Sequence, residues 1–363
     1  MSDKNLELLA EDFFKASLES SPTSAIMRGR KEYFDQIEEL TEEKFEKEIQ
    51  NVNNFKQRLS EIDFENLSSR EKVTYGMLEF ALDSNHDSLI DRSWEFSAGV
   101  AGFEGFLIDY NQQMFVPDKE SSDMLLKRLE LYQRFYSQIS DVQKQGLSKN
   151  RVATQRNLER SIDQLESYLD TSLEEDPLLL VNFSPEIDEN EVSQWKDKAK
   201  DIIEKYVRPS VMSYLEQLQV DHLPKGRTDE NPGIMWIDGG EEVYLRSLRK
   251  YTGHKETTVK EVHEIGLSEI ERLKKEFFEI GKNVFDGVEK PEDVLYKMQT
   301  EPSMRYESKE QMLQLAEDTI ERAYKPLGEW FTVFPKAPCK VLPVPTQSEK
   351  HAPPAYYFPP LPD

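Results

Sequence analysis

Apolar residues recur at steps of three and four positions along most of this chain, and no other feature constrains its fold more. The clearest run lies between Thr258 and Val284. Its apolar face is formed by Val262, Gly266, Ile270, Leu273, Phe277, Ile280 and Val284. Because residues at this spacing share one side of an α-helix, the run predicts a helix with one apolar face. Thr258 and Glu261 have the spacing of a capping box, which marks the start of the helix. Gly266 would let another helix approach that face closely.

The same periodicity predicts more helices elsewhere. They are expected over residues 5–19, 68–87, 122–145, 152–173, 191–218, 291–299 and 309–325, with a further one starting at 241. The buried stripe of the 122–145 helix is predicted to be Leu125, Leu129, Tyr132, Tyr136, Ile139 and Val142. Gly146 would end that helix, and Pro209 would kink the 191–218 helix because proline lacks a backbone donor.

Strand signals are sparse and gather near the C-terminus. They are the segments 331–334, 339–344 and 355–358. Nine of the 19 prolines also lie in residues 331–363, so the helical pattern gives way to extended chain near Trp330. The sequence therefore predicts a mainly α fold. An irregular multi-helix body spans residues 1–330, and a Pro- and aromatic-rich extended segment with a few short β-strands spans 331–363.

Charge and cysteine content narrow the classes of partner. Charged residues make up 32% of the chain and the formal net charge is −24, a surface that repels nucleic acid and anionic membranes. Cys339 is the single cysteine, which excludes an internal disulfide and fits a reducing compartment. The first residues lack the basic and then apolar pattern of a signal peptide, and no apolar run reaches membrane-spanning length. We therefore expect a cytoplasmic protein with no nucleic-acid or membrane partner.

A search for metal-binding and catalytic motifs finds none that is complete. A zincin helix needs histidines at positions i and i+4, with a glutamate at i+1 that activates water. His263–Glu264 supplies the first half of this pattern, but the position of the second histidine is Leu267. His263 is therefore predicted to be structural. Cys339 lies among prolines without a recognisable nucleophile motif, so it is predicted to be non-catalytic. The sequence thus predicts no catalytic and no metal-binding residue.

The segment "APPAYYFPPLPD" (352–363) permits two interpretations. Its prolines are typical of a polyproline II ligand for an aromatic groove. Tyr356, Tyr357 and Phe358 are strand-forming residues, however, and favour a strand that packs inside a larger fold.

Four stretches resemble the family called domain of unknown function 885, a group of helical proteins related to zinc metallopeptidases. They are "EDFFKASLESSPTSAI" (11–26), "MLLKRLELYQRFYSQISDVQKQG" (124–146), "GEEVYLRSLRKYTGHKETTVKEVHEIGLSEIERLKKEFFEIG" (240–281) and "PAYYFPPLPD" (354–363). The resemblance spans essentially the whole chain but only the N-terminal part of the family's length.

This resemblance implies an incomplete zincin-like helical fold. Complete members carry an H-E-x-x-x-G-H metal helix beyond the Tyr-Tyr strand, and this chain lacks it, so no catalytic or metal residue carries over. Zinc is implied for complete members and is not expected to be bound by this chain. The body would form one wall of a substrate cleft. Tyr356 and Tyr357 would form a strand beside a peptide substrate, where strand addition could hold the peptide.

Three functional hypotheses follow from these observations. The first is an N-terminal portion of a metallopeptidase-like protein that is inactive by itself, because the metal helix is absent. The second is a non-catalytic helical scaffold that binds a partner. The third is an enzyme whose site lies in these residues without a recognised motif. An unpartnered strand at 355–358 would expose aromatic side chains, so we also expect the isolated chain to be poorly soluble or partly unfolded.

Overall fold

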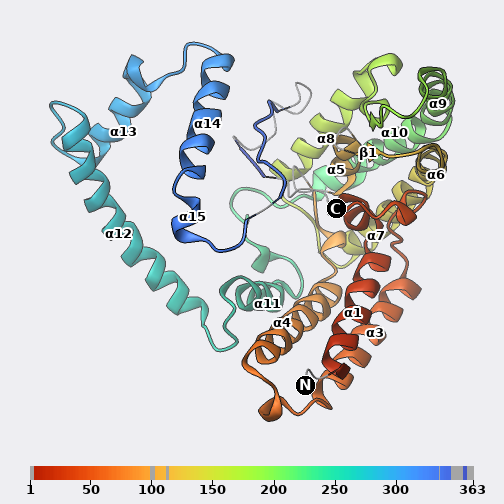
Figure 1. Cartoon of the computed structure of the whole chain (residues 1–363), viewed down its shortest axis with the longest axis horizontal. Coiled ribbons are helices and arrows are strands. Elements are labelled where there is room, and N and C mark those ends of the chain that lie inside the picture. Colours follow the sequence, from red (N-terminus) through yellow and green to blue (C-terminus); the bar gives the residue numbers. More distant parts are fainter. Residues whose placement is uncertain (1–3, 99–102, 112–113, 335, 345–354, 358–363) are drawn as a thin grey trace. The chain divides into compact units, whose positions relative to one another are not determined.

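The structure, a computed structural model, describes residues 4–98, 103–111, 114–334, 336–344 and 355–357 (Figure 1). They form two compact units that divide between Gly253 and His254. The division falls earlier than residue 330, where the sequence pattern places the start of the extended segment. The described residues from Phe331 onward contain neither helix nor strand.

Helices dominate both units, which confirms the mainly α fold class. Those of the larger unit are α1 Lys4–Ser20, α2 Pro22–Met27, α3 Glu42–Ser60, α4 Ser69–Asp91, α5 Phe103–Tyr110, α6 Lys119–Glu130, α7 Tyr132–Ser148, α8 Gln155–Asp170, α9 Glu189–Ile202, α10 Arg208–Gln217 and α11 Gly240–Thr252. Those of the smaller unit are α12 Val259–Val284, α13 Pro291–Thr300, α14 Lys309–Tyr324 and α15 Leu327–Trp330. Among the described residues, no helix has both the length and the apolar composition that crossing a bilayer requires.

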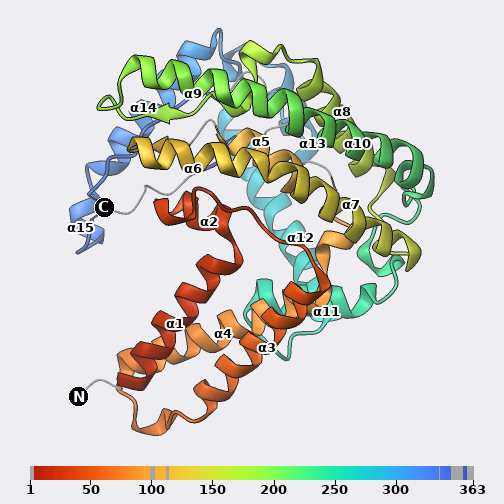
Figure 2. The same cartoon turned by 90° about the vertical axis from the view of Figure 1, so that its right-hand side faces the viewer.

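The main core of the larger unit surrounds α7. Helices α6 and α10 pack against α7, and α9 packs against α6 (Figure 2). The predicted stripe is buried throughout, although the helix expected over 122–145 is two helices, α6 and α7, that meet at Leu131. Tyr136 contributes an aromatic contact across the core, with its ring centroid 5.6 Å from that of Tyr214. Such a continuous buried apolar cluster supplies most of the free energy that holds these helices together.

A second, smaller core lies between α1, α3 and α4. Its buried members are Leu6, Leu9, Val52, Leu59, Leu67, Leu78 and Leu82. The capping box predicted at Ser68 and Glu71 is present: the Ser68 hydroxyl accepts from the Glu71 amide, and the Glu71 carboxylate accepts from the Ser68 amide. Local capping and packing thus agree on where α4 begins.

A π-helical turn lies directly before Pro209, the residue at which the sequence predicts a kink. Helix α9 ends at Ile202, residues Ile203–Val207 form the π turn, and α10 begins at Arg208. Pro209 is then the second residue of α10, and its missing backbone donor removes one hydrogen bond from a helix that runs on through the π turn. A second π turn, Leu218–His222, follows α10.

Strands occupy a different place from the one that the sequence indicates. The two short strands are β1 Phe115–Val116 and β2 Asn182–Phe183, which pair in parallel. The predicted strands at 331–334, 339–344 and 355–358 are wrong for the described residues of these segments. The physical reason is that a strand needs a neighbour for its backbone groups. No other described strand lies alongside them, and their prolines lack amide donors.

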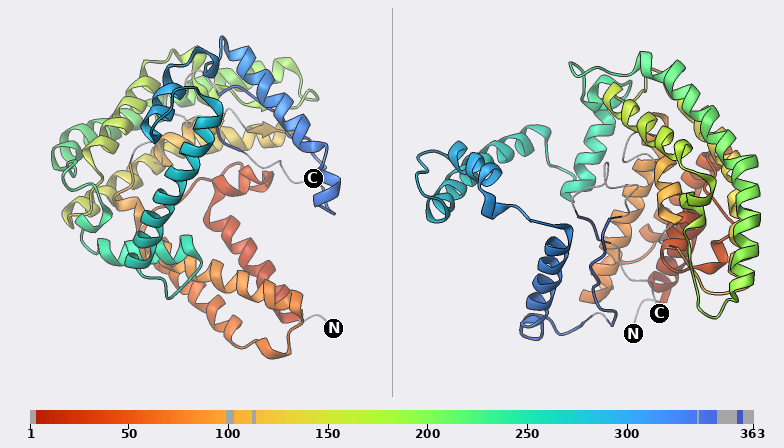
Figure 3. Two further views of the ribbon diagram at one scale, coloured as in Figure 1. Left: turned by 90° about the vertical axis from the view of Figure 1, so that its left-hand side faces the viewer. Right: turned by 90° about the horizontal axis from the view of Figure 1, so that it is seen from above.

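The smaller unit is built on α12, a single helix that is coloured teal in Figure 3. It has 26 residues and begins with the predicted capping box of Thr258 and Glu261. Helix α13 packs against the C-terminal end of α12. The two helices approach so closely there that a Cβ atom on Gly281 would lie 2.3 Å from Cγ2 of Val294. Val294 is the single buried apolar residue among the described residues of this unit.

Gly146 has a role in packing rather than in ending a helix. Helix α7 continues past it to Ser148, so the predicted stop is two residues early. A Cβ atom on Gly146 would lie 2.4 Å from the backbone oxygen of Glu95, in the short turn Ser93–Glu95 that packs against α7. Only glycine permits this approach.

We expect Gly146→Ala to lower the free energy of unfolding by about 1–3 kcal/mol, because the added methyl group overpacks a backbone contact. Gly76→Ala is the matched control. Gly76 is also helical, in α4, but a Cβ atom there would have nothing within 4 Å. The control should be neutral or stabilising by up to about 1 kcal/mol. Urea unfolding of both variants measures the difference, and equal effects would contradict the packing role.

Candidate functional site

The most connected polar cluster in the larger unit centres on Glu95. This residue ends the short turn Ser93–Glu95, directly after α4. Arg92 forms the link between them in the left-handed conformation (φ 47°, ψ 50°), which few residues other than glycine and asparagine adopt. The turn directs Glu95 inward, and only 2% of its surface is exposed.

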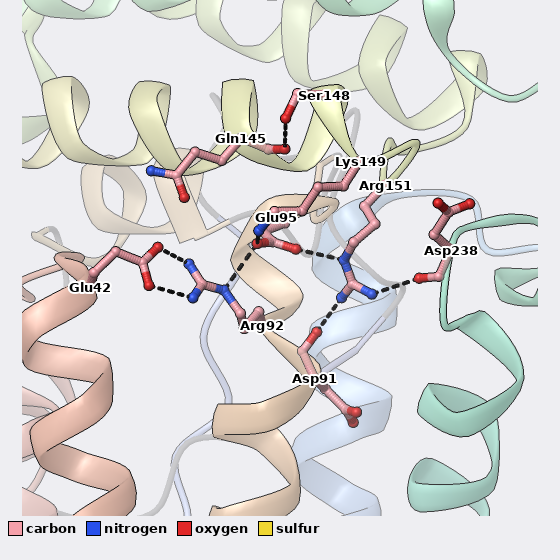
Figure 4. A network of polar contacts seen from close by, with 9 residues as sticks. All are labelled: Glu42, Asp91, Arg92, Glu95, Gln145, Ser148, Lys149, Arg151 and Asp238. Carbon is pink, nitrogen blue, oxygen red and sulfur yellow. Dashed lines mark hydrogen bonds and ion pairs between the residues drawn. The ribbon is translucent and has the colours of Figure 1, made fainter.

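Three cationic side chains neutralise the Glu95 carboxylate (Figure 4). Its Oε1 atom lies 2.9 Å from Nε of Arg92 and 2.9 Å from Nζ of Lys149. Its Oε2 atom lies 2.5 Å from Nε of Arg151. Lys149 and Arg151 follow directly after α7, so the carboxylate joins the end of α4 to the end of α7.

The same arginines extend this network to two more helices. The Arg92 guanidinium donates two hydrogen bonds to the Glu42 carboxylate at the start of α3, over 2.6 and 2.5 Å. This bidentate hydrogen bond lowers the pKa of Glu42 and raises that of Arg92. The Arg151 guanidinium donates to the backbone oxygens of Asp91 and Asp238. Asp238 precedes α11, so the network connects α3, α4, α7 and α11.

Asp91 adds a further ion pair at the last residue of α4. Its carboxylate accepts a hydrogen bond from Nε of Arg246 in α11. Burial raises the pKa of Asp91, while the Arg246 guanidinium acts in the opposite direction. The ion pair therefore ties α11 to α4 a second time.

A second buried carboxylate, Asp176, is saturated in the same way. The Asp176 side chain is fully buried and accepts from the Leu178 amide over 3.0 Å and from the Tyr168 hydroxyl over 3.1 Å. The Arg208 guanidinium donates to Oδ2 of Asp176 from Nε and from a terminal nitrogen, over 3.1 and 2.9 Å. Burial nevertheless raises the pKa of both Asp176 and Tyr168. Asp176 lies in the connection between α8 and α9, which it anchors to α8 and α10.

Both clusters are suited to holding helices together rather than to acid–base chemistry. A general base needs an oxygen that can accept a proton from a substrate within hydrogen-bonding distance. Both oxygens of Asp176 accept hydrogen bonds from the protein, and in Glu95 Oε1 accepts from Lys149 while Oε2 is ion-paired with Arg151. Burying a carboxylate costs free energy of desolvation. Such a carboxylate therefore stabilises the fold only while its cationic and hydrogen-bonding partners offset that cost.

The histidines do not converge on a metal site. His263 is exposed on α12, His86 is in α4, and His222 is buried with Nδ1 3.3 Å from the backbone oxygen of Gln217. His351 lies outside the described residues. Among the residues that the structure describes, no three His, Cys, Asp or Glu side chains form a group that could hold a metal ion. The residues present thus do not fit the zinc that the family resemblance implies for complete members.

Tyr356 and Tyr357 are the residues for which the sequence predicts a role beside the substrate. Both are exposed, at 45% and 72%, and lie in a segment that is neither helix nor strand. Phe358 and the residues after it lie outside the described part. Cys339, also exposed, donates a backbone hydrogen bond to the Tyr324 hydroxyl over 3.1 Å.

Two surface pockets of about 100 and 270 Å³ lie beside α1 and α3, and both are lined in part by Glu19, Ser20 and Lys44. Their polar groups contact one another: the Ser20 hydroxyl donates to Glu48 over 2.6 Å, and Lys44 Nζ lies 3.2 Å from the same oxygen. These contacts leave the pockets without a convergent set of groups that would identify a ligand.

Sequence reasoning missed Glu95 because nothing distinguishes it among 70 acidic residues. Its cationic partners come from positions 92, 149 and 151, a long-range set that no local spacing reveals. Asp176 had a usable signal, since an aspartate before a proline often opens a turn through its own side chain. The Leu178 amide bond to Asp176 is this turn.

Comparisons with known proteins identify a family and a shared fold. The family model described as "Bacterial protein of unknown function (DUF885)" matches residues 22–363. A crystal structure described as that of "the putative lipoprotein from Colwellia psychrerythraea" has a TM-score of 0.83 and 16% sequence identity. The match covers 98% of this chain but 65% of that one. No curated protein matches the sequence.

We expect Glu95→Gln to lower the free energy of unfolding by up to about 3 kcal/mol, because it leaves the partly buried Arg92 and Arg151 without their shared counter-charge. The matched control is Asp229→Asn, which removes an exposed ion pair with Arg156 (70% and 64% exposed side chains) and should cost about 1 kcal/mol or less. Chemical denaturation monitored by far-UV circular dichroism measures both. A loss for Glu95→Gln no larger than that of the control would show that the network does not brace the helices.

Proposed function

This chain belongs to the DUF885 family, and from that premise we propose that it forms the non-catalytic helical portion of a metallopeptidase-like fold. The observation that carries the proposal is the length of the match. The fold is shared over 98% of this chain, whereas 35% of the Colwellia chain has no counterpart here. A chain that matches only part of a larger fold contributes structure and binding surface to it. The residues that carry out peptide hydrolysis would lie in the remaining part.

The chemistry of such a fold would depend on zinc, which supplies a Lewis acid and an activated water when bound. The saturated carboxylates Glu95 and Asp176 support a structural role for the larger unit, as one wall of a substrate cleft. Their partners hold α3, α4, α7, α10 and α11 in fixed positions, and a cleft wall requires such rigidity.

The proposed contribution of the smaller unit to substrate binding lies at Tyr356 and Tyr357. A peptide can bind to a non-helical segment by strand addition. Exposed tyrosines beside that backbone add large apolar contact area together with a polar end. A peptide is therefore the proposed ligand of this segment, in the complete protein.

A non-catalytic scaffold is the second candidate function, and one observation favours it. Of the 37 large apolar residues that are exposed among the described residues, 22 lie between His254 and Pro360. Such a concentration is typical of a surface that binds another protein. On this hypothesis the chain binds a partner without any role in hydrolysis.

The proposed location is the cytoplasm, with neither nucleic acid nor membrane as a partner. The net charge of −24 and the single, exposed Cys339 support it.

We expect the purified chain to bind no stoichiometric zinc and to hydrolyse no peptide above the level of a chelator-treated sample. Elemental analysis and a mixed-peptide cleavage assay measure these outcomes. Glu264→Gln is an informative variant, because Glu264 follows the one histidine in a partial zincin pattern. Cleavage by the chain that is abolished by this variant would contradict the proposal and favour a site within these residues.

The role of the two tyrosines makes a separate prediction. In a complete family member that cleaves peptides, alanine at the positions of Tyr356 and Tyr357 should raise KM at least about tenfold, because a bound peptide loses contact area. Steady-state kinetics measures the change. Alanine at the position of Tyr251, which is 85% exposed in α11, is the control and should leave KM unchanged. An unchanged KM in the tyrosine variant would remove this segment from the binding site.

A further inference from the structure

The smaller unit has helices but almost no core of its own. The two hydrophobic clusters among the described residues lie entirely within residues 6–218. Between His254 and Pro360, the described residues include one buried apolar side chain, that of Val294. Fixing the backbone of a residue costs about 1–2 kcal/mol, and burial of apolar surface is the main term that offsets this cost. One buried valine does not offset the ordering of four helices.

The local signals of α12 are nevertheless those of a helix that packs against a neighbour. It has a complete capping box and a regular apolar face. On and beside that face, Ile265, Ile270, Leu273, Ile280 and Val284 are between 49% and 60% exposed. Gly266 lies on the face, and a Cβ atom there would have nothing within 4 Å. The sequence thus provides a place for close helix approach that no described element occupies.

The smaller unit also differs from the rest of the chain in net charge. Residues 254–360 contain 15 Lys and Arg and 19 Asp and Glu, whereas the whole chain contains 46 and 70. The unit therefore carries only −4 of the net charge of −24. A nearly neutral, apolar surface is suited to burial, whereas the strongly acidic remainder is suited to solvent.

We propose that the apolar face of α12, together with the exposed apolar residues of α13 and α14, is the docking surface for a further helical part of the same family fold. This occupant corresponds to the portion of the Colwellia chain that has no counterpart here. The inference rests on the proposed function, since it requires this chain to form part of a larger fold.

The distribution of the exposed residues favours this occupant over a second copy of the chain. A twofold contact covers one patch of about 800 Å² on each partner. Here large apolar side chains are exposed on every helix of the unit, among them Leu295 and Tyr296 of α13 and Met312 of α14. A unit that lacks a core throughout needs a surrounding body of helices, which a single isologous patch does not provide.

Hydrogen exchange of the intact chain tests whether the face is uncovered. Helix α4 is a matched internal standard, because α4 and α12 are 23 and 26 residues long and both begin with a capping box. Only α4 packs against other helices along its length. We expect α12 amides to exchange at least about 30-fold faster than those of α4. In the full-length Colwellia protein, the helix that superposes on α12 should be protected to the same degree as the counterpart of α4.

Variants on α12 distinguish an exposed apolar face from one that is already buried or that forms a dimer contact. Combined Ile270→Gln, Leu273→Gln and Ile280→Gln should reduce binding of a hydrophobic dye by about half and leave the main unfolding midpoint unchanged. The control places the same number of changes on the opposite side of α12, as Glu271→Gln, Lys275→Gln and Glu279→Gln, and should leave dye binding unchanged. Light scattering of the unmodified chain should report a monomer.

Three results would overturn the inference. One is α12 protection equal to that of α4 in the isolated chain. Another is loss of the main unfolding transition in the Ile270, Leu273 and Ile280 variant, which would show that the face is already buried. The third is a dimer that this variant dissociates, which would make a second copy the occupant. None of these measurements involves zinc or hydrolysis. The inference about the α12 face can therefore be overturned while the catalytic part of the proposed function still holds.

Discussion

The larger unit depends on one buried carboxylate with three cations. Glu95 loses most of its hydration on folding, a cost that only close opposite charges can offset. Arg92, Lys149 and Arg151 meet it from the ends of α4 and α7. The position of Gly146 follows from the same contact, because the Glu95 backbone must approach α7 for its side chain to reach these cations. Packing and electrostatics therefore fix a single arrangement of these helices.

The two units are stabilised by different kinds of interaction. The larger unit combines a continuous apolar core with buried ion pairs. Burial of apolar surface and hydrogen-bonded charge pairs therefore both stabilise it. The smaller unit relies on local terms such as capping boxes, helix propensity and exposed ion pairs within α12. Local terms of this kind contribute only tenths of a kcal/mol each. They specify where helices begin and end, but not what those helices pack against.

Helical periodicity and capping predicted much of the fold. Ser68 and Thr258 were correctly identified as helix starts, and the stripe from Leu125 to Val142 is buried. The predicted strands failed because β-propensity at 331–334 and 355–358 describes a residue's preference, whereas a strand requires a partner. The buried ion pairs could not be predicted either. They include residues more than 50 positions apart, such as Glu95 and Lys149, and one glutamate resembles another in a sequence with 70 acidic residues.

The described residues of 254–360 form almost no core, which has a consequence for the order of events during synthesis. The residues of both apolar clusters leave the ribosome before α12 does, so the larger unit can complete its cores first. Translation of the following 107 residues takes about 5–20 s at ordinary elongation rates. During that interval α12 carries an apolar face in solvent, and its capping box and exposed ion pairs favour the helical form over extended chain that aggregates. The local signals of α12 thus favour the helix while its apolar face is exposed to solvent.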